Sequence, residues 1–459
     1  MGKHGKDDDA KSAHRSQRHA WILYLALFVL AIVVVQLVSI RATGIATTKT
    51  NQVSTQEDWN VIAKELAAEK EAARKPIKNT ASEKSFSETV VSSQKDKPVE
   101  KKKKAVAQPD KETVLVPMWG LSHEPKNDVI MSLGFGYQRR EFARFISTLR
   151  RSGYNGDIVL ATEPEERMKK GVAEYLKNQN VLAYGFTYEC IKKGQKNYVG
   201  SGRKLLVTPG GCWLTNWYAH ADTRGPRPLA LARYEMYRSW LLKYSSKSWG
   251  IIFDFRDTFF QANPLARVDR SKSQPNLILF AENRLVKRIG NCVFNSGWLR
   301  CWGRDIPKKY ANNSVVCSGS TLGSSSALLA YSERMIQEFD KQECHLGPTQ
   351  SQSDQGYHNY LYHSKAFHTL PGVRIAHHEQ GYGGLVNTIG AMNGFRVPKH
   401  MKGPLDSHWK IRDSKGFIYE YDGTLSAAIH QWDRFAKELT KFVDSLVNEY
   451  EKRPPNDRS

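Results

Sequence analysis

Two carboxylates stand directly behind a short apolar run. Ile251–Phe253 has the composition of a buried strand, and Asp254, Arg256 and Asp257 follow before aromatic residues resume. Carboxylate oxygens at the carboxyl end of a strand can hold a divalent cation that bridges to a diphosphate group. In the alternative interpretation, the two aspartates are simply paired with Arg256 and Arg267.

A histidine follows a second apolar run near the end of the chain. His430 lies in the segment Ala428-Ile-His-Gln-Trp-Asp433, and its ring nitrogen would complete a ligand set with Asp254 and Asp257. Two carboxylates and one imidazole suit Mn²⁺ better than Ca²⁺, with Mg²⁺ as the other candidate. A histidine at a strand end is otherwise a buried structural residue, so the metal role depends on its meeting the two aspartates.

An arginine precedes the acidic strand on a predicted helix. The Arg233 guanidinium group has the fork geometry that holds a diphosphate through two hydrogen bonds. The same residue could instead form an ion pair with Glu235 or Asp257, and the sequence leaves both interpretations open.

Polar residues that could contact a donor sugar form two further groups. The first lies in Cys317–Gly323 and comprises Ser318, Gly319 and Ser320. It offers hydroxyl groups and close backbone approach, although the same composition suits a loop. In the second, Asp354 and Gln355 place a carboxylate and an amide at the start of a helix, where an aspartate is also a good N-cap.

Hydrophobic periodicity predicts an α/β domain over residues 127–452. The predicted strands are Val129–Leu133, Ile158–Thr162, Val181–Tyr184, Ile251–Phe253 and Leu277–Phe280. The predicted helices are Arg139–Leu149, Pro164–Leu176, Pro228–Tyr244, Ser324–Phe339, Gln355–His363 and Asp433–Tyr450. Strands that alternate with helices favour a mostly parallel central sheet with right-handed crossovers and flanking helices.

The first 126 residues show three different compositions. Residues 1–20 are polar and basic, residues 21–40 carry no charge, and residues 41–126 are rich in Lys, Glu, Ser, Thr and Ala. The apolar run matches a bilayer core, and the basic excess before it predicts a cytoplasmic amino terminus. We therefore predict a tail, a transmembrane signal-anchor helix and a flexible lumenal stem, in which Asp58–Arg74 favours a short self-associating helix that would make a homodimer. Residues 453–459 are predicted to be a disordered tail.

Charge and cysteine content limit the classes of function. The net charge of +22 would permit nucleic-acid binding, but no zinc-finger spacing or RNA-binding aromatic signature is present. Much of the basic charge lies in the tail and the stem, so we predict no nucleic-acid partner. The six cysteines are even in number and none belongs to a CxxC pair, which leaves disulfides and buried thiols as equal alternatives.

The order of these candidate residues resembles the layout of GT-A nucleotide-sugar glycosyltransferases. The matching residues are Arg233, Asp254-Phe-Arg-Asp257, Cys317-Ser-Gly-Ser-Thr-Leu-Gly323, Asp354-Gln355 and His430-Gln-Trp-Asp-Arg434. They are most similar to glycogenin-like family 8 enzymes and to related type II membrane glycosyltransferases, and the likeness covers residues 128–452.

This resemblance implies a role for each matching residue. Asp254, Asp257 and His430 would bind the metal, and Arg233 would bind the donor. Asp354 and Gln355 would form the acidic and amide pair beside the transferred sugar, as the catalytic residues. The sequence departs from the pattern at one point, because Arg256 occupies the position where the second acid is usual.

The resemblance also implies a biological setting. The chain would be a Golgi-resident, single-pass type II membrane enzyme with a Rossmann-like GT-A domain in the lumen. It would use Mn²⁺ or Mg²⁺ to move a hexosyl or pentosyl group, with retention, from a nucleotide-sugar donor (a UDP-sugar) to a glycan or glycoprotein acceptor. The Arg256 departure motivates a second hypothesis, a membrane-tethered sugar-binding or scaffold protein with an inactive transferase-like site.

Overall fold

The computed structural model describes residues 113–192, 195–198, 212–220, 226–341, 353–392 and 413–454. All of them belong to one compact unit, residues 103–459. The predicted tail, the transmembrane span at 21–40, the stem up to residue 112 and most of the carboxyl-terminal tail lie outside the described residues. Among the helices that are described, none combines the length and the apolar character needed to cross a membrane.

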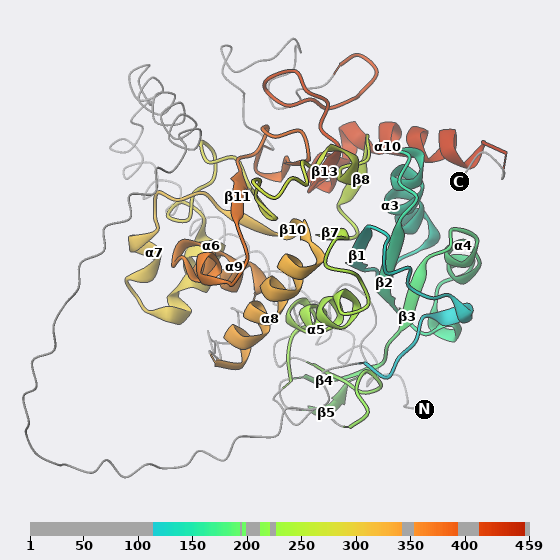
Figure 1. The fold of residues 1–459 in the computed structure, drawn as a ribbon, viewed down its shortest axis with the longest axis horizontal. Coiled ribbons are helices and arrows are strands. Elements are labelled where there is room, and N and C mark those ends of the chain that lie inside the picture. Colours follow the sequence, from blue (N-terminus) through green and yellow to red (C-terminus); the bar gives the residue numbers. More distant parts are fainter. Residues whose placement is uncertain are drawn as a thin grey trace, which may run out of the picture. The chain divides into compact units, whose positions relative to one another are not determined.

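A seven-stranded sheet forms the centre of the unit (Figure 1). Its strand order is β11-β9-β10-β7-β1-β2-β3. The strands are β1 (Val129–Leu133), β2 (Asp157–Thr162), β3 (Leu182–Gly185), β7 (Trp249–Phe253), β9 (Leu277–Ala281), β10 (Val316–Ser324) and β11 (Ile375–His378). All pairings are parallel except those of β10, which runs antiparallel to both β7 and β9. The prediction of a mostly parallel α/β sheet is therefore confirmed.

Two small sheets accompany the central one. The first has the order β12-β13-β8 and consists of β8 (Thr258–Phe260), β12 (Val386–Thr388) and β13 (Ala428–His430). The second has the order β5-β4-β6 and consists of β4 (Tyr188–Lys192), β5 (Gln195–Tyr198) and β6 (Cys212–Leu214). The first matters for the site, because its strand β8 begins four residues after Asp254.

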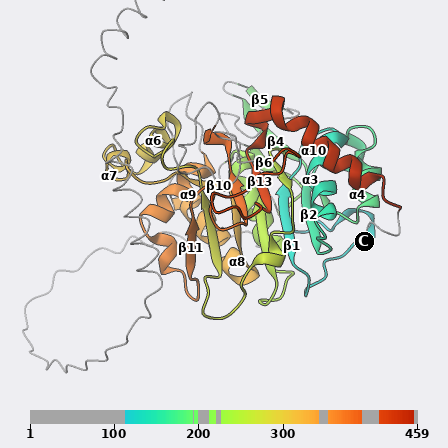
Figure 2. The ribbon, with the colours of Figure 1, turned by 90° about the horizontal axis from the view of Figure 1, so that it is seen from above.

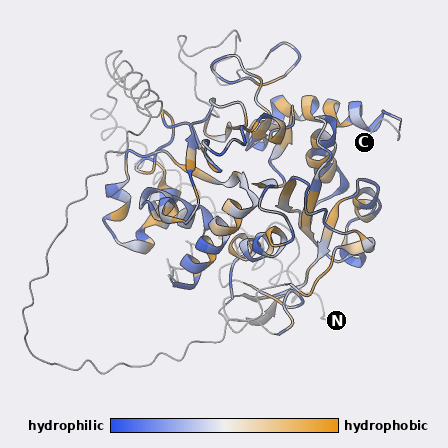
Figure 3. Cartoon of the chain, viewed as in Figure 1, coloured by the Kyte–Doolittle hydropathy of each residue, from blue (hydrophilic) through white to orange (hydrophobic). Residues whose placement is uncertain are grey.

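Helices cover both faces of the central sheet, as the views in Figures 1 and 2 agree. Every residue of β1 is buried, so alternate side chains enter opposite layers. Val129 packs in the layer that contains α5 (Leu229–Leu241) and α8 (Ser325–Lys341). Ile130 packs in the layer that contains α3 (Arg139–Arg151), α4 (Val172–Asn178) and α10 (Ala436–Glu451). Figure 3 shows apolar and hydrophilic residues alternating along α10, the pattern of a helix with one buried face.

Three sequence-based boundaries need correction. The helix predicted over Pro164–Leu176 is interrupted, because Met168 is extended and Gly171 has a φ of 74°; only a 3-10 turn and α4 form. The segment Cys317–Gly323 is not a loop but lies within β10, where Ser320–Gly323 pair with β7 and Thr321–Gly323 pair with β9. The final helix begins at Ala436, after a 3-10 turn at Trp432–Phe435.

The folded unit also begins earlier than the predicted stem boundary at residue 126. Val114 donates its backbone N–H to the Trp217 carbonyl, and the His123 ring contacts the hydroxyl groups of Tyr184 and Tyr244. Residues 113–126 therefore pack against the domain. Their few apolar and aromatic side chains find partners that are distant in sequence, which composition alone does not reveal.

The cysteines divide between the two predicted states. Cys190 and Cys212 form a disulfide that joins β4 and β6, and Cys301 is also disulfide-bonded. Cys292 and Cys317 are buried free thiols. Neither alternative from the sequence therefore holds for every cysteine, and Cys317 proves to belong to the site described below.

Glu420 couples the stability of this fold to pH. Its side chain is fully buried, Ser426 Oγ donates a hydrogen bond to Oε1 at 2.6 Å, and Oε2 has no partner among the described residues. Burial raises the pKa of Glu420 from 4.5 to about 7. Between these two pH values the folded state therefore holds a proton that the unfolded chain has released.

The free energy of unfolding is consequently expected to fall as the pH rises through this window, by at most about 3 kcal/mol. Glu420→Gln cannot titrate and should lose this part of the pH dependence. Denaturant unfolding at pH 5 and pH 8 measures the difference, and the same fall in both proteins would contradict the assignment.

Candidate active site

Two strand pairings bring Asp254 and His430 together. Asp254 follows the last residue of β7, and its backbone N–H donates to the Gly319 carbonyl in β10 at 2.8 Å. His430 ends β13, which pairs antiparallel with β8 so that His430 lies opposite Thr258. Because β8 directly follows the acidic segment, residues 176 positions apart meet at the carboxyl end of the central strand, where ligands bind in open α/β sheets.

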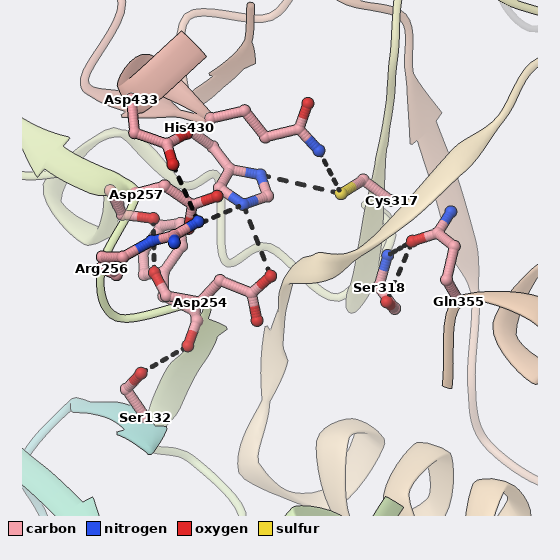
Figure 4. A network of polar contacts seen from close by, with 12 residues as sticks. Ser132, Asp254, Arg256, Asp257, Cys317, Ser318, Gln355, His430 and Asp433 are labelled. Carbon is pink, nitrogen blue, oxygen red and sulfur yellow. Dashed lines mark hydrogen bonds and ion pairs between the residues drawn. The ribbon is translucent and has the colours of Figure 1, made fainter. Parts of the chain in front are cut away.

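Asp254, Asp257 and His430 form one cluster, here called the ligand cluster (Figure 4). His430 Nε2 lies 3.8 Å from Asp254 Oδ2 and 3.8 Å from Asp257 Oδ1. One ligand atom from each residue lies within 4.8 Å of the other two. The structure thus brings together the three residues that the sequence predicted as metal ligands, and Asp257 faces the cluster although Arg256 precedes it.

The surroundings of the ligand cluster fit a divalent cation. His430 Nε2 is buried and has no hydrogen-bond partner among the described residues, which is costly unless the site holds a ligand. Gly319 borders the cluster so closely that an added Cβ atom would lie 2.4 Å from Asp254 Oδ2 and 2.6 Å from His430 Cε1. Two carboxylates and an imidazole are ligands that Mn²⁺ accepts.

The electrostatics of the cluster point the same way. For Asp254, burial raises the pKa, but Arg233 and His430 outweigh it and hold the pKa of this carboxyl well below its usual value. Burial raises the pKa of Asp257, the charge of His430 opposes this, and the Asp254 charge adds to it. Two adjacent carboxylates that compete for ionisation gain from a cation between them.

The three side chains of the ligand cluster differ in exposure. The His430 side chain is fully buried and that of Asp257 is 9 % exposed, whereas that of Asp254 is 37 % exposed. A bound cation would therefore keep its free coordination positions on the Asp254 side. An open position is what distinguishes a metal that meets a substrate from a closed structural site.

The simple ion pairs considered for the two aspartates do not form. Arg256 pairs with Asp433 at 2.8 Å, and Arg267 donates to the backbone carbonyl groups of Gly384 and Leu425. Because Arg256 is turned to Asp433, it leaves the ligand cluster accessible to Asp257. Asp257 keeps Oδ1 toward His430, and its Oδ2 accepts a hydrogen bond from Arg434 Nη1 at 3.1 Å. The inactive-site hypothesis stays an alternative.

Arg233 is held between two carboxylates. Its Nη1 donates to Asp254 Oδ1 and its Nη2 to Asp354 Oδ2, so it contacts neither Glu235 nor Asp257 through these bonds. Burial lowers the pKa of Arg233, but Asp354 and Asp254 outweigh it and raise the pKa well above its usual value. Arg233 thereby ties the first residue of α9 (Asp354–His363) to the ligand cluster and leaves Asp254 Oδ2 facing His430.

Arg233→Gln should unfold more easily than the wild type by about 3 kcal/mol, because Asp354 keeps a buried charge without its partner. The double variant Arg233→Gln/Asp354→Asn, in which that charge is also removed, should recover part of the loss. Denaturant unfolding gives both values. The control is Arg238→Gln, since Arg238 pairs with the half-exposed Glu333. Equal losses at positions 233 and 238 would refute the bridging role.

Asp354 and Gln355 lie where α9 meets β10. Ser353, not Asp354, occupies the N-cap position, so the capping explanation for Asp354 is wrong. Gln355 Oε1 accepts hydrogen bonds from the Ser318 backbone N–H and Oγ, and its Nε2 donates to the Val316 carbonyl at 2.6 Å. The amide of Gln355 therefore fixes β10 beside the ligand cluster.

The other residues predicted to contact a donor differ in placement. Gly319 touches the ligand cluster, and Ser318 is bound to Gln355. Ser320 is fully buried opposite Phe253, and its Oγ has no partner among the described residues. Alternation along β10 places both serines on the face away from Gly319.

Sequence reasoning missed the residue that orients His430. Cys317 Sγ lies 3.7 Å from His430 Nδ1, and Gln431 Nε2 donates to the same sulfur at 3.6 Å. Burial lowers the pKa of His430, but Cys317 and the two aspartates of the ligand cluster outweigh it and raise the pKa well above its usual value. A bound cation would replace the proton on Nε2, while the proton on Nδ1 would stay directed at Cys317. The sequence carried no signal for this contact, because the two residues are 113 positions apart and the segment around Cys317 drew attention only for its hydroxyl groups.

Comparison with known proteins adds similarities at the level of solved structures only. No protein-family model and no curated protein matches the chain. A galactosyltransferase LgtC complex with donor and acceptor sugar analogues covers 72 % of this chain and 99 % of its own, at 12 % identity and a TM-score of 0.35. The bifunctional glycosyltransferase WbbM covers 72 % and 52 % of the two chains, with the same identity and score.

The glycosyltransferase GlyE of Streptococcus pneumoniae covers 71 % of this chain and 63 % of its own, at 14 % identity and a TM-score of 0.34. Likenesses of this size do not assign the chain to a family. The functional conclusion therefore depends on the ligand cluster and its surroundings, which place three residues that could hold a metal ion at the carboxyl end of a central strand.

Proposed function

We propose that the chain is a metal-dependent glycosyltransferase of GT-A type. It transfers a hexosyl or pentosyl group from a nucleotide diphosphate sugar to a glycan or glycoprotein. A UDP-sugar is the donor that we propose. One observation carries the proposal: the unpartnered, buried Nε2 atom of His430 faces Asp254 and Asp257 beside the central strand. The resemblance of the residue order to glycogenin-like enzymes supports the choice of reaction.

Each residue of the site has a distinct task in this reaction. A bound Mn²⁺ or Mg²⁺ would neutralise the charge that develops on the departing diphosphate. Asp254, Asp257 and His430 would hold the cation, with Cys317 directing the imidazole. Arg233, already paired with two carboxylates, orients Asp254 instead of binding the diphosphate directly.

Asp354 and Gln355 are the catalytic pair of the proposal. Both stand at the start of α9. Asp354 is linked to the site by its ion pair with Arg233, and Gln355 by its hydrogen bond with Ser318. In this arrangement the transferred sugar lies between α9 and the cation, and a retaining outcome follows from the family resemblance.

A panel of nucleotide sugars tests the function directly. The full chain, purified in detergent, is incubated with each donor and Mn²⁺, and release of the nucleoside diphosphate is measured with and without EDTA. At least one donor should be hydrolysed slowly without acceptor, and EDTA should stop the reaction. Nucleotide or sugar binding that Mn²⁺ does not strengthen, with no turnover, would favour the sugar-binding or scaffold alternative.

We further propose that the enzyme is a single-pass type II protein of the Golgi membrane with its folded unit in the lumen. The sequon Asn312-Asn-Ser314 supports this topology, because Asn312 is exposed in the folded unit. Expressed in a eukaryotic secretory system, the chain should lose mass on treatment with a glycosidase, and Asn312→Gln should not. An identical mass for the treated and untreated wild type would place Asn312 outside the lumen.

A further inference from the structure

An exposed aromatic residue marks the segment between β9 and β10. Helix α6 (Val293–Leu299) carries Val293, 76 % exposed, and Phe294, 67 % exposed. Among the described residues, Phe294 is the only aromatic side chain in the set of exposed large hydrophobic residues. Its ring lies beside that of Trp298, with centroids 6.0 Å apart and planes 34° apart. Apolar surface of this kind usually marks a binding site.

The aromatic pair is attached to the helix that carries the predicted catalytic residues. Trp298 packs so tightly on Gly356 that an added Cβ atom there would lie 2.7 Å from Trp298 Cβ. Gly356 directly follows Asp354 and Gln355. Trp302, just beyond α6, stacks on Tyr360 of α9 at 4.2 Å with nearly parallel rings. Helices α6 and α9 therefore pack against each other, and Figures 1 and 2 show them together.

The position in the sheet assigns this surface to the acceptor. β7, which presents Asp254, has β1, β2 and β3 on one side and β10, β9 and β11 on the other. The parallel β1–β3 half has the β-α-β architecture that binds nucleotides at its carboxyl ends. Helix α6 follows β9 and so belongs to the opposite half, which leaves it for the molecule that receives the sugar.

The charge around α6 indicates which acceptor would fit. Between residues 288 and 309 the exposed basic residues are Arg288, Arg300, Arg304, Lys308 and Lys309, and the exposed acidic residue is Asp305. Helix α6 contacts α7 (Ile306–Lys309) and the 3-10 turn Arg300–Trp302, so Arg300, Lys308 and Lys309 lie on elements that pack against α6, and Arg304 lies in the link between those two elements. Such a surface attracts anions over distances of about 10 Å at moderate salt.

We propose that Phe294 and Trp298 form an acceptor subsite for an anionic glycan, with a sugar ring against the aromatic pair and acidic groups toward the basic side chains. The inference rests on the proposed function for its position in the reaction. The C–H bonds on one face of a sugar ring are weakly positive and match the negative face of an aromatic ring. The basic residues add selectivity for sulfated, phosphorylated or uronic-acid sugars over neutral ones.

Binding of glycans to the full chain in detergent tests the subsite without donor or metal. Heparin-derived oligosaccharides and neutral oligosaccharides of equal length are the probes, and affinity is measured by calorimetry or interferometry. We expect the anionic set to bind more tightly. Phe294→Ala should weaken that binding by about fivefold or more, and Arg300→Gln/Arg304→Gln should bring the anionic set close to the neutral one.

The matched control is Leu242→Ala, another exposed hydrophobic residue, which follows α5 and precedes the amino end of β7, whereas α6 follows the carboxyl end of β9. It should bind glycans like the wild type. Unchanged glycan affinity in Phe294→Ala would overturn the proposal. So would Phe294-dependent binding to vesicles of anionic lipid without binding to glycans, or Phe294-dependent self-association without binding to glycans.

Failure of the subsite and failure of the proposed function give different results. Phe294→Ala should retain the Mn²⁺-dependent hydrolysis of donor that occurs without acceptor, while its KM for an anionic acceptor rises. Loss of hydrolysis in Phe294→Ala would show that the residue supports the site structurally and would overturn its role as a subsite. A wild type that binds anionic glycans through Phe294 but hydrolyses no donor would refute the transferase and retain the glycan surface.

Discussion

Replacement of Asp254 by asparagine should lower metal-dependent turnover of the nucleotide sugar by about 10²–10³-fold in kcat/KM, which is about 3–4 kcal/mol of transition-state stabilisation. Asparagine keeps the shape of the side chain but removes the charge that the cation needs. Asp254 is also the exposed member of the ligand cluster, on the side where a diphosphate would approach. Among the three residues of the ligand cluster, Asp254 alone is both a charged candidate ligand and more than a third exposed.

The matched control for this variant is Asp269→Asn. Asp269 is an exposed aspartate whose Oδ1 accepts a hydrogen bond from the Ser271 backbone N–H, and it does not belong to the ligand cluster. It should retain wild-type turnover. Full activity of Asp254→Asn, with the same dependence on Mn²⁺ concentration, would remove Asp254 from the account.

The second large effect is expected at a position with no side chain. In Gly319→Ala the new methyl group would lie 2.4 Å from Asp254 Oδ2 and 2.6 Å from His430 Cε1, closer than real Cβ atoms approach. The carboxylate and the imidazole must then move apart, so the cation loses its geometry. We expect Mn²⁺ affinity to fall by about tenfold to hundredfold, as when residues that orient metal ligands are replaced.

Ser320→Ala is the control on the same strand. The Ser320 hydroxyl is buried without a partner among the described residues, and alternation turns it away from Gly319. This variant should bind Mn²⁺ as the wild type does and be no less stable. If both variants lose Mn²⁺ affinity equally, the effect comes from β10 as a whole and not from contact of Gly319 with the ligand cluster.

The elements of the fold could be predicted where one residue pattern decides the structure. The apolar runs of β1, β7 and β9 were sufficient because every residue of these strands is buried. The periodic pattern of α3 was sufficient because the helix buries one apolar face. The helix predicted at Pro164 is interrupted by the positive φ of Gly171. This conformation could not be predicted, because a single glycine in a polar segment is also compatible with a continuous helix.

The residues of the site could be predicted from the sequence, but their hydrogen-bond and ion-pair partners could not. Residue type and position behind apolar runs identified Asp254, Asp257 and His430 as candidate ligands, and the structure brings the three together. Which carboxylates Arg233 would meet depended on where α9 starts relative to α5, a packing relation with no local signal. The Cys317 contact likewise required the antiparallel insertion of β10, whereas the sequence pattern suggested only parallel strands or a loop.

Direct titration of the protein with Mn²⁺, followed by electron paramagnetic resonance, is the measurement closest to the central claim. The account predicts one saturable site in the wild type, tightened by UDP, and loss of that site in His430→Ala with the fold retained by circular dichroism. Equal Mn²⁺ binding by the wild type and by folded His430→Ala would contradict the claim that Asp254, Asp257 and His430 together hold the cation.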